Sequence, residues 1–204
     1  MLAIIPVNRP TGAKRRLAEL LSEGQRAALV RVMLQDVVDA CHAAREIDSI
    51  LVVTPEPSLA PTGVRVLEDP GLGHGEAIAL GLSLATEAAI VVMADCPLVR
   101  PEALDRLARA AEPVAIAPAQ DGGTNALALR PPHSVEPAFG EAGGAEIVAA
   151  RARALGYEPA IVEDEGFAVD VDTPDDVERL LAIGEGTRTH AFLHAVLASD
   201  ARPA

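Results

Sequence analysis

The stretch Ala89–Pro101, AIVVMADCPLVRP, constrains the fold of this 204-residue chain more than any other. Its apolar, β-branched run Ile90–Met93 is typical of a strand that is buried on both faces of a sheet. The run is followed at once by Asp95, and Pro101 is placed to open a helix at its first position. In an open α/β sheet, side chains at the carboxyl ends of strands face the crevice that binds ligands. We therefore expect Asp95 to lie in a ligand-binding crevice.

Strand-like and helix-like patterns alternate along the whole chain. Strands are expected at residues 2–7, 50–53, 64–67, 90–93, 114–117, 126–129, 160–162 and 167–171. Helices are expected at 14–21, 22–45, 76–87, 102–111, 144–156 and 188–197, and a further helix is expected to begin at 173. Ser22 and Gln25 form a capping-box pattern, and Thr173-Pro174 is a helix start. Asp121-Gly122-Gly123 predicts a hairpin turn, hence one antiparallel strand pair. The alternation predicts a single α/β domain over residues 1–204, with a mixed, mostly parallel central sheet flanked by helices.

The charge of the chain limits its partners. A formal net charge of −13 argues against a nucleic acid or an anionic membrane as partner. We see no signal peptide and no apolar run of transmembrane length, so a cytoplasmic location is expected. Cys41 and Cys96 are the only cysteines, neither in a CxxC, and we expect both to be reduced and inert.

A second acidic stretch, Asp170-Val171-Asp172, closes another apolar run. If this stretch is extended, alternate residues project to the same side, so both carboxylates can reach one ion. Magnesium prefers hard oxygen ligands, and Asp95 at another strand end would supply a third. The alternative is that Asp172 stabilises the N-terminus of the next helix while Asp170 is solvated.

The loop after the first strand carries a small basic cluster. Lys14, the one lysine of the chain, lies beside Arg15 and Arg16, with Arg9 nearby. Cations at a helix start can bind a phosphate together with backbone N–H groups. The pattern G-x-x-x-x-G-K-[ST] is absent, so this is not a Walker A loop. An exposed basic loop is the alternative interpretation.

Glycine-containing stretches offer further anion sites, with plain turns as the alternative. Thr124 and Asn125 follow Gly122-Gly123 and add a hydroxyl and an amide. Gly140 and Gly143-Gly144 precede a helix whose N-terminus could bind an anion. Gly71–Gly75 is a similar but less specific stretch.

Five motifs in order resemble the 2-phospho-L-lactate guanylyltransferase family, whose members activate a phospho-acid for the deazaflavin coenzyme F-420. The motifs are PVNRPTGAKRRLAELLSEGQRAALVRVMLQDVV, MADCPL, APAQDGGTNALAL, FG…G and AVDVDTPDDVERLL. Together they cover nearly the whole chain. The resemblance implies a glycosyltransferase-A-like nucleotidyltransferase fold. It also implies transfer of GMP from GTP to a small phosphorylated acid, with release of pyrophosphate.

The resemblance also implies roles for individual residues, each at a position that matches a family motif. Lys14 and Arg16 match the A-K-x-R-L that meets the GTP phosphates, with Pro6, Val7 and Asp95 in the same nucleotide site. Asp95, Asp170 and Asp172 match the aspartates that bind Mg²⁺. Thr124, Asn125, Gly140 and Gly143 fall at the acceptor, which in different members is 2-phospholactate, phosphoenolpyruvate or 3-phosphoglycerate. The implied partners are GTP and this acid, and a homodimer is left open.

The chain departs from the family pattern in three places, all of which bear on the acceptor more than on the fold. Gly143 stands where a serine is expected, the histidine that usually follows is missing from 144–151, and the asparagine of a G-L-N stretch is replaced within Gly73–Gly75.

Two other readings stay open. One is a related nucleotidyltransferase of the same fold that uses CTP or serves the molybdenum cofactor or a sugar phosphate. The other is a diverged paralogue that binds nucleotide and acts as a sensor or partner without turnover.

Overall fold

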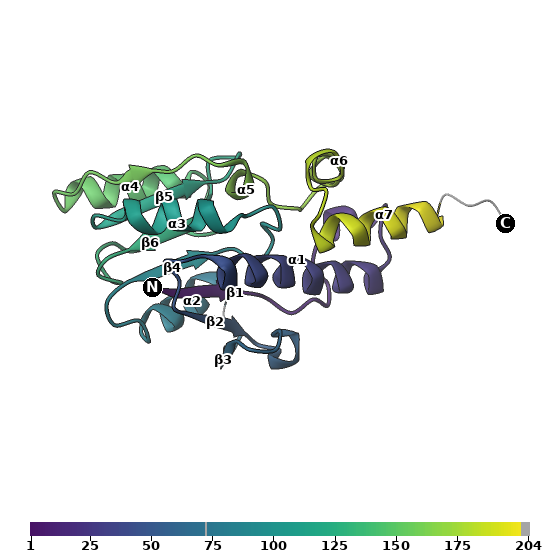
Figure 1. Ribbon diagram of the computed structural model, residues 1–204, viewed down its shortest axis with the longest axis horizontal. Helices are drawn as coiled ribbons and strands as arrows, with labels where there is room; N and C mark the ends of the chain where they lie inside the picture. Colours follow the sequence, from purple (N-terminus) through teal and green to yellow (C-terminus); the bar gives the residue numbers. More distant parts are fainter. Residues whose placement is uncertain (72, 201–204) are drawn as a thin grey trace.

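The computed structural model describes residues 1–71 and 73–200. At its centre lies a seven-stranded sheet with the strand order β3-β2-β1-β4-β6-β5-β7 (Figure 1). Its strands are β1 (Leu2–Pro6), β2 (Ser49–Thr54), β3 (Arg65–Glu68), β4 (Ala89–Val92), β5 (Val114–Pro118), β6 (Thr124–Leu129) and β7 (Ala160–Ile161). Strand β6 runs antiparallel to both β4 and β5, and the other pairs are parallel. The mixed, mostly parallel sheet is therefore confirmed, including the hairpin before β6.

Helices cover both faces of the sheet. In the described residues the α-helices are α1 (Glu23–Ala43), α2 (His74–Leu82), α3 (Pro101–Ala110), α4 (Gly144–Ala154), α5 (Glu165–Ala168), α6 (Pro174–Ile183) and α7 (Arg188–Asp200), with 3-10 turns η1 (Arg15–Leu17) and η2 (Pro57–Leu59). None of the helices in that part of the chain is both long and apolar enough to cross a membrane.

Two hydrophobic layers lie on opposite faces of the sheet, as the period-two geometry of strands requires. Ile5 and Val92 face the layer that contains α1, α3 and α7, whereas Ile4 and Val91 face the layer that contains α2 and α4. Every residue of β1 and of β4 is buried, which confirms the prediction of a strand covered on both faces. Helices α1 and α7 lie side by side (Figure 1).

Both predicted N-caps are confirmed as full capping boxes. The Ser22 side chain accepts from the Gln25 N–H and Gln25 returns a bond to the Ser22 N–H, and Thr173 and Asp176 do the same at α6. The two cysteines are buried and free, as expected. Burial raises the pKa of Cys41 to about 12 and that of Cys96 well above its ordinary value.

Two local predictions were wrong. The helix expected at 14–21 is only the three-residue turn η1, because Lys14 has a left-handed backbone (φ 50°) and Ser22 already caps the next helix. The strand expected at 167–171 is the short helix α5 followed by an irregular segment. Asp164 caps this helix by accepting from the Gly166 N–H, and Gly166 fits there because a Cβ would lie 2.5 Å from the Leu98 carbonyl.

Candidate active site

A cavity of about 380 Å³ opens at the carboxyl ends of β1 and β4. Pro6 and Val7 line it where β1 ends, and Asp95 lines it just past β4. Lys14 and Asp172 also lie in its wall, so the cavity carries charges of both signs. The crevice predicted from the strand ends is thus present, and it contains four of the residues expected to meet the nucleotide.

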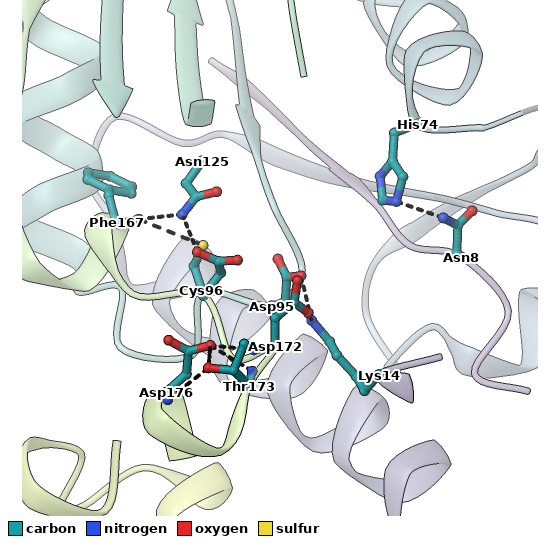
Figure 2. A network of polar contacts seen from close by, with 11 residues as sticks. Asn8, Lys14, His74, Asp95, Cys96, Asn125, Phe167, Asp172, Thr173 and Asp176 are labelled. Carbon is teal, nitrogen blue, oxygen red and sulfur yellow. Dashed lines mark hydrogen bonds and ion pairs between the residues drawn. The ribbon is translucent and has the colours of Figure 1, made fainter. Parts of the chain in front are cut away.

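Lys14 forms the centre of the charged group in this cavity. Its Nζ atom lies 2.7 Å from Oδ2 of Asp95 and 2.5 Å from Oδ1 of Asp172 (Figure 2). The Lys14 side chain is 9% exposed, while those of Asp95 and Asp172 are 25% and 43% exposed. Burial opposes the charge of Lys14, yet Asp95 and Asp172 raise its pKa above the ordinary value. Desolvation likewise opposes the charge of Asp95, but the Lys14 ammonium holds the pKa of that carboxyl below its usual value.

Asp95, Asp170 and Asp172 converge, although the segment that carries the last two is not a strand. One carboxylate oxygen from each lies within 4.8 Å of the others. Three hard oxygen donors at this spacing suit Mg²⁺ or Mn²⁺, so the donor chemistry fits the expected metal. The predicted convergence is therefore present, and the assignment of a metal to it stays a prediction.

Backbone and side-chain contacts hold the Asp170–Asp172 segment in place. The Val171 N–H donates to the Asp95 carbonyl (3.1 Å), which ties this segment to the loop after β4. The N–H groups of Asp172 and Thr173 both donate to Oδ2 of Asp176 (3.0 and 2.7 Å), so the capping box of α6 orients the backbone at Asp172. Thr173 and Asp176 form the capping box of α6, as expected, and the alternative in which Asp172 only stabilises the N-terminus of this helix stays open.

Asn125 positions Asp170 from the start of β6. Its Nδ2 atom donates to the Phe167 carbonyl (2.8 Å) and to Oδ1 of Asp170 (3.2 Å), as Figure 2 shows in part. Burial and the neighbouring charge of Asp95 raise the pKa of Asp170, against the hydrogen bond from Asn125. These contacts favour a positioning role for Asn125 rather than contact with the acceptor.

The other predicted acceptor residues lie at a separate corner. Gly143 is the N-cap residue of α4, with φ +70°, and Gly140 has φ +74°. A Cβ at Gly144 would lie 3.2 Å from Oγ1 of Thr124, so this hydroxyl faces the first turn of α4. Oγ1 of Thr124 is buried and has no hydrogen-bond partner. Neither Thr124 nor these glycines lines the cavity at the ends of β1 and β4.

The basic residues of the N-terminal loop separate into two groups. Arg9 lines the cavity together with Lys14. Arg16 is exposed and lies outside its wall, so the structure does not bring it to Asp95. Sequence reasoning named Arg9 only as part of a basic cluster, although it lies three residues after the end of β1.

His74 and Asn8 are cavity residues that sequence reasoning missed. His74 is the first residue of α2, and its Nε2 atom lies 2.6 Å from Nδ2 of Asn8 (Figure 2). The other ring nitrogen, Nδ1, is buried without a partner. The signal was available: His74 falls within the stretch Gly73–Gly75, where the family asparagine is replaced.

A larger cavity of about 560 Å³ lies between α2 and residues 133–141. It has no lysine or arginine in its wall and is lined instead by Glu76, Glu136 and Glu141. These carboxylates would repel a triphosphate, so the larger cavity is less suited to an anionic ligand than the smaller one.

Comparison with known proteins agrees with this geometry. Residues 1–201 match the family described as "Guanylyl transferase CofC like". A phosphoenolpyruvate guanylyltransferase of Sphaerobacter thermophilus is 38% identical over 190 residues, covering 88% of this chain and 91% of the relative. A 3-phospho-D-glycerate guanylyltransferase of Phenylobacterium zucineum is 35% identical, with 94% of both chains covered. A 2-phospho-L-lactate guanylyltransferase of Methanothermobacter thermautotrophicus is 32% identical, covering 94% and 88%.

A solved structure supports the fold. The protein, from Desulfovibrio desulfuricans G20 and described as a nucleotide-diphospho-sugar transferase, superposes with a TM-score of 0.78 over 97% of this chain and 96% of that one, at 20% identity. The mixed α/β sheet with flanking helices is thus the same fold as in that solved structure. By the family match over nearly its whole length, the chain belongs to the CofC-like family of guanylyltransferases.

Proposed function

We propose that this protein transfers GMP from GTP to a small phosphorylated acid and releases pyrophosphate. The observation that carries the proposal is the convergence of Asp95, Asp170 and Asp172 beside Lys14 in a cavity at the strand ends, in a chain of the guanylyltransferase family. The acceptors of the three relatives above are all phospho-acids, and we extend that substrate class to this chain. The reaction would serve coenzyme F-420 synthesis in the cytoplasm.

Each charged residue has a role in this proposal. Asp95, Asp170 and Asp172 would hold Mg²⁺, which when bound would offset phosphate charge and align the two reacting phosphates. Lys14 would bind the triphosphate and offset the charge that develops on pyrophosphate. Arg9, rather than Arg16, is placed to contribute a second cation from the cavity wall. No side chain need act as general base, because the acceptor phosphate is already anionic at neutral pH.

The acceptor is proposed to bind at the corner formed by β6 and the start of α4. The buried Thr124 hydroxyl has no partner, and the backbone N–H groups at the N-terminus of α4 favour an anion. The left-handed backbone at Gly143 suits glycine, so a backbone N–H would take over from the serine hydroxyl that this chain lacks.

The test is pyrophosphate release from GTP and Mg²⁺ with 2-phospholactate, phosphoenolpyruvate, 3-phosphoglycerate and a sugar 1-phosphate offered separately. We expect release with one phospho-acid and none with the sugar phosphate. A parallel series with CTP and ATP tests the nucleotide, and preference for CTP would favour the related nucleotidyltransferase.

A second candidate function rests on the three departures from the family pattern, at Gly143, at residues 144–151 and within Gly73–Gly75. A diverged paralogue would bind GTP yet release no pyrophosphate with any acid. Measurable GTP binding without turnover would therefore replace the enzymatic proposal with a sensor or partner role.

A further inference from the structure

Lys14 occupies an unusual position for a residue that is proposed to bind phosphate. It is the one lysine in the chain, and its side chain is almost fully enclosed. Its ammonium contacts two carboxylates at once, Asp95 at 2.7 Å and Asp172 at 2.5 Å, and these come from separate elements of the fold (Figure 2).

The oxygens that Lys14 contacts are also those of the metal cluster. Oδ2 of Asp95 and Oδ1 of Asp172 each accept a charge-assisted hydrogen bond from Nζ. Asp170 does not contact Lys14; its Oδ1 accepts instead from Asn125. A divalent cation bound to Oδ2 of Asp95 and Oδ1 of Asp172 would lie close to the positive charge of the Lys14 ammonium. The ammonium and the cation therefore compete for these two oxygens.

The cavity offers Lys14 another partner. Lys14 lies in the cavity wall with Arg9, Thr11 and Gly12. The two cations make this the basic side of the proposed nucleotide site. A triphosphate in that cavity would present anionic oxygens to Nζ, and Lys14 has a long, flexible stem with rotatable donors. The ammonium can therefore exchange carboxylates for phosphates without becoming unpaired.

We propose that Lys14 couples metal binding to nucleotide binding: the triphosphate draws the ammonium away from Asp95 and Asp172 and thereby frees their oxygens for the divalent cation. This inference rests on the proposed function, since it requires a triphosphate in the cavity. It assigns Lys14 a positioning role before the reaction. Because coupling between two sites is reciprocal, the cation also strengthens nucleotide binding by the same factor.

The first experiment measures Mn²⁺ binding to the full chain by electron paramagnetic resonance, with and without the non-cleavable analogue guanosine 5′-(α,β-methylene)triphosphate. For the wild type, the analogue should strengthen Mn²⁺ binding by about 5- to 150-fold, the usual range for coupled sites. Lys14→Met should bind Mn²⁺ more tightly than the wild type when no nucleotide is present, and should lose most of the strengthening.

Arg9→Met is the matched control. It removes one positive charge from the same cavity but leaves the ammonium on Asp95 and Asp172. Its Mn²⁺ affinity without nucleotide should stay close to that of the wild type. If Arg9→Met and Lys14→Met strengthen Mn²⁺ binding equally, the effect is one of general charge and the proposal is overturned.

The second experiment uses the wild type alone, so it does not depend on whether a variant folds. Labelling lysine with ¹⁵N places a single ε-ammonium signal in the NMR spectrum, since the chain has one lysine. The signal should be protected from exchange in the free protein and should shift when the analogue is added with Mg²⁺. An unchanged signal in the presence of bound analogue contradicts the proposal.

The two proposals can fail separately. If pyrophosphate is released with a phospho-acid while Mn²⁺ binds equally well with and without nucleotide, the guanylyltransferase function stands and the coupling by Lys14 is wrong. If the protein does not bind the guanosine analogue at all, the proposed function itself is wrong.

Discussion

The backbone N–H of Val171 donates to the carbonyl oxygen of Asp95 at 3.1 Å. This bond joins the loop after β4 to the irregular segment before α6, and it places the carboxylates of Asp170 and Asp172 beside that of Asp95. The arrangement resembles one rung of a sheet, although no strand forms there. The acidic cluster therefore depends on how this segment is held, as well as on the aspartates themselves.

Asp172→Asn should abolish turnover while leaving the fold intact. The substitution removes an anionic ligand and one partner of the Lys14 ammonium, so the loss should exceed the roughly 10- to 100-fold effect of removing an outer-shell partner. Pyrophosphate release and thermal unfolding would be measured together. Asp175→Asn, an exposed position three residues on, is the control. Activity of Asp172→Asn close to that of the wild type would remove Asp172 from the site.

Asn125→Leu should lower both stability and metal affinity. The Nδ2 atom of Asn125 satisfies the buried Phe167 carbonyl and also holds Asp170. Leaving such groups unpaired costs about 1–3 kcal/mol, and loss of an outer-shell contact weakens metal binding about 10- to 100-fold. Urea unfolding and Mn²⁺ titration measure the two effects. A variant with normal Mn²⁺ affinity would mean that Asp170 is oriented without Asn125.

Thr173→Ala and Ser22→Ala form a matched pair, because each removes the side chain of a capping box. Each should lose about 1 kcal/mol of unfolding free energy. Only Thr173→Ala should also lower activity, since the Thr173 hydroxyl donates to Oδ2 of Asp176, the same oxygen that accepts from the N–H of Asp172. Equal activity in the two variants would show that the cap of α6 has no bearing on the site.

Lys14→Ala should raise the GTP concentration required for half-maximal rate, because no other lysine can substitute. Arg9→Ala should have a smaller effect of the same kind, and Arg16→Ala a smaller one still, since Arg9 lines the cavity and Arg16 does not. Steady-state kinetics with GTP as the varied substrate would rank the three. If Arg16→Ala has the larger effect, the arginine implied by the family motif is the relevant one.

The buried Cys41 thiol gives the protein a predictable loss of stability at high pH. Its pKa is raised from 9.0 to about 12 in the fold, so the unfolded state loses this proton first. The contribution of the protonated Cys41 thiol to the unfolding free energy is fully present below pH 9 and is lost as pH rises toward 12. Between pH 10 and 11, the unfolding free energy should fall about 1.4 kcal/mol more in the wild type than in Cys41→Ala. If the unfolding free energy falls equally with pH in the two proteins, the Cys41 thiol is in contact with water in the folded state.

The sequence was sufficient wherever structure depends on residues close together along the chain. The buried run before Asp95, the capping boxes at Ser22 and Thr173 and the hairpin at Gly122-Gly123 follow from strand periodicity and from hydrogen bonds that span three or four residues. The prediction of a strand at 167–171 failed, because a side-chain cap at Asp164 and a close approach of Gly166 to the Leu98 carbonyl form the helical turn α5 at Glu165–Ala168.

The sequence by itself determined the α/β class, the strand that ends at Asp95 and the set of acidic and basic residues available for chemistry. Only the tertiary structure decided which of them meet. It paired Lys14 with Asp95 and Asp172, brought His74 to Asn8 and left Arg16 in solvent. The physical reason is that these contacts join residues 66 to 158 positions apart. Strand order and the packing of loops set such contacts, and no local periodicity encodes them.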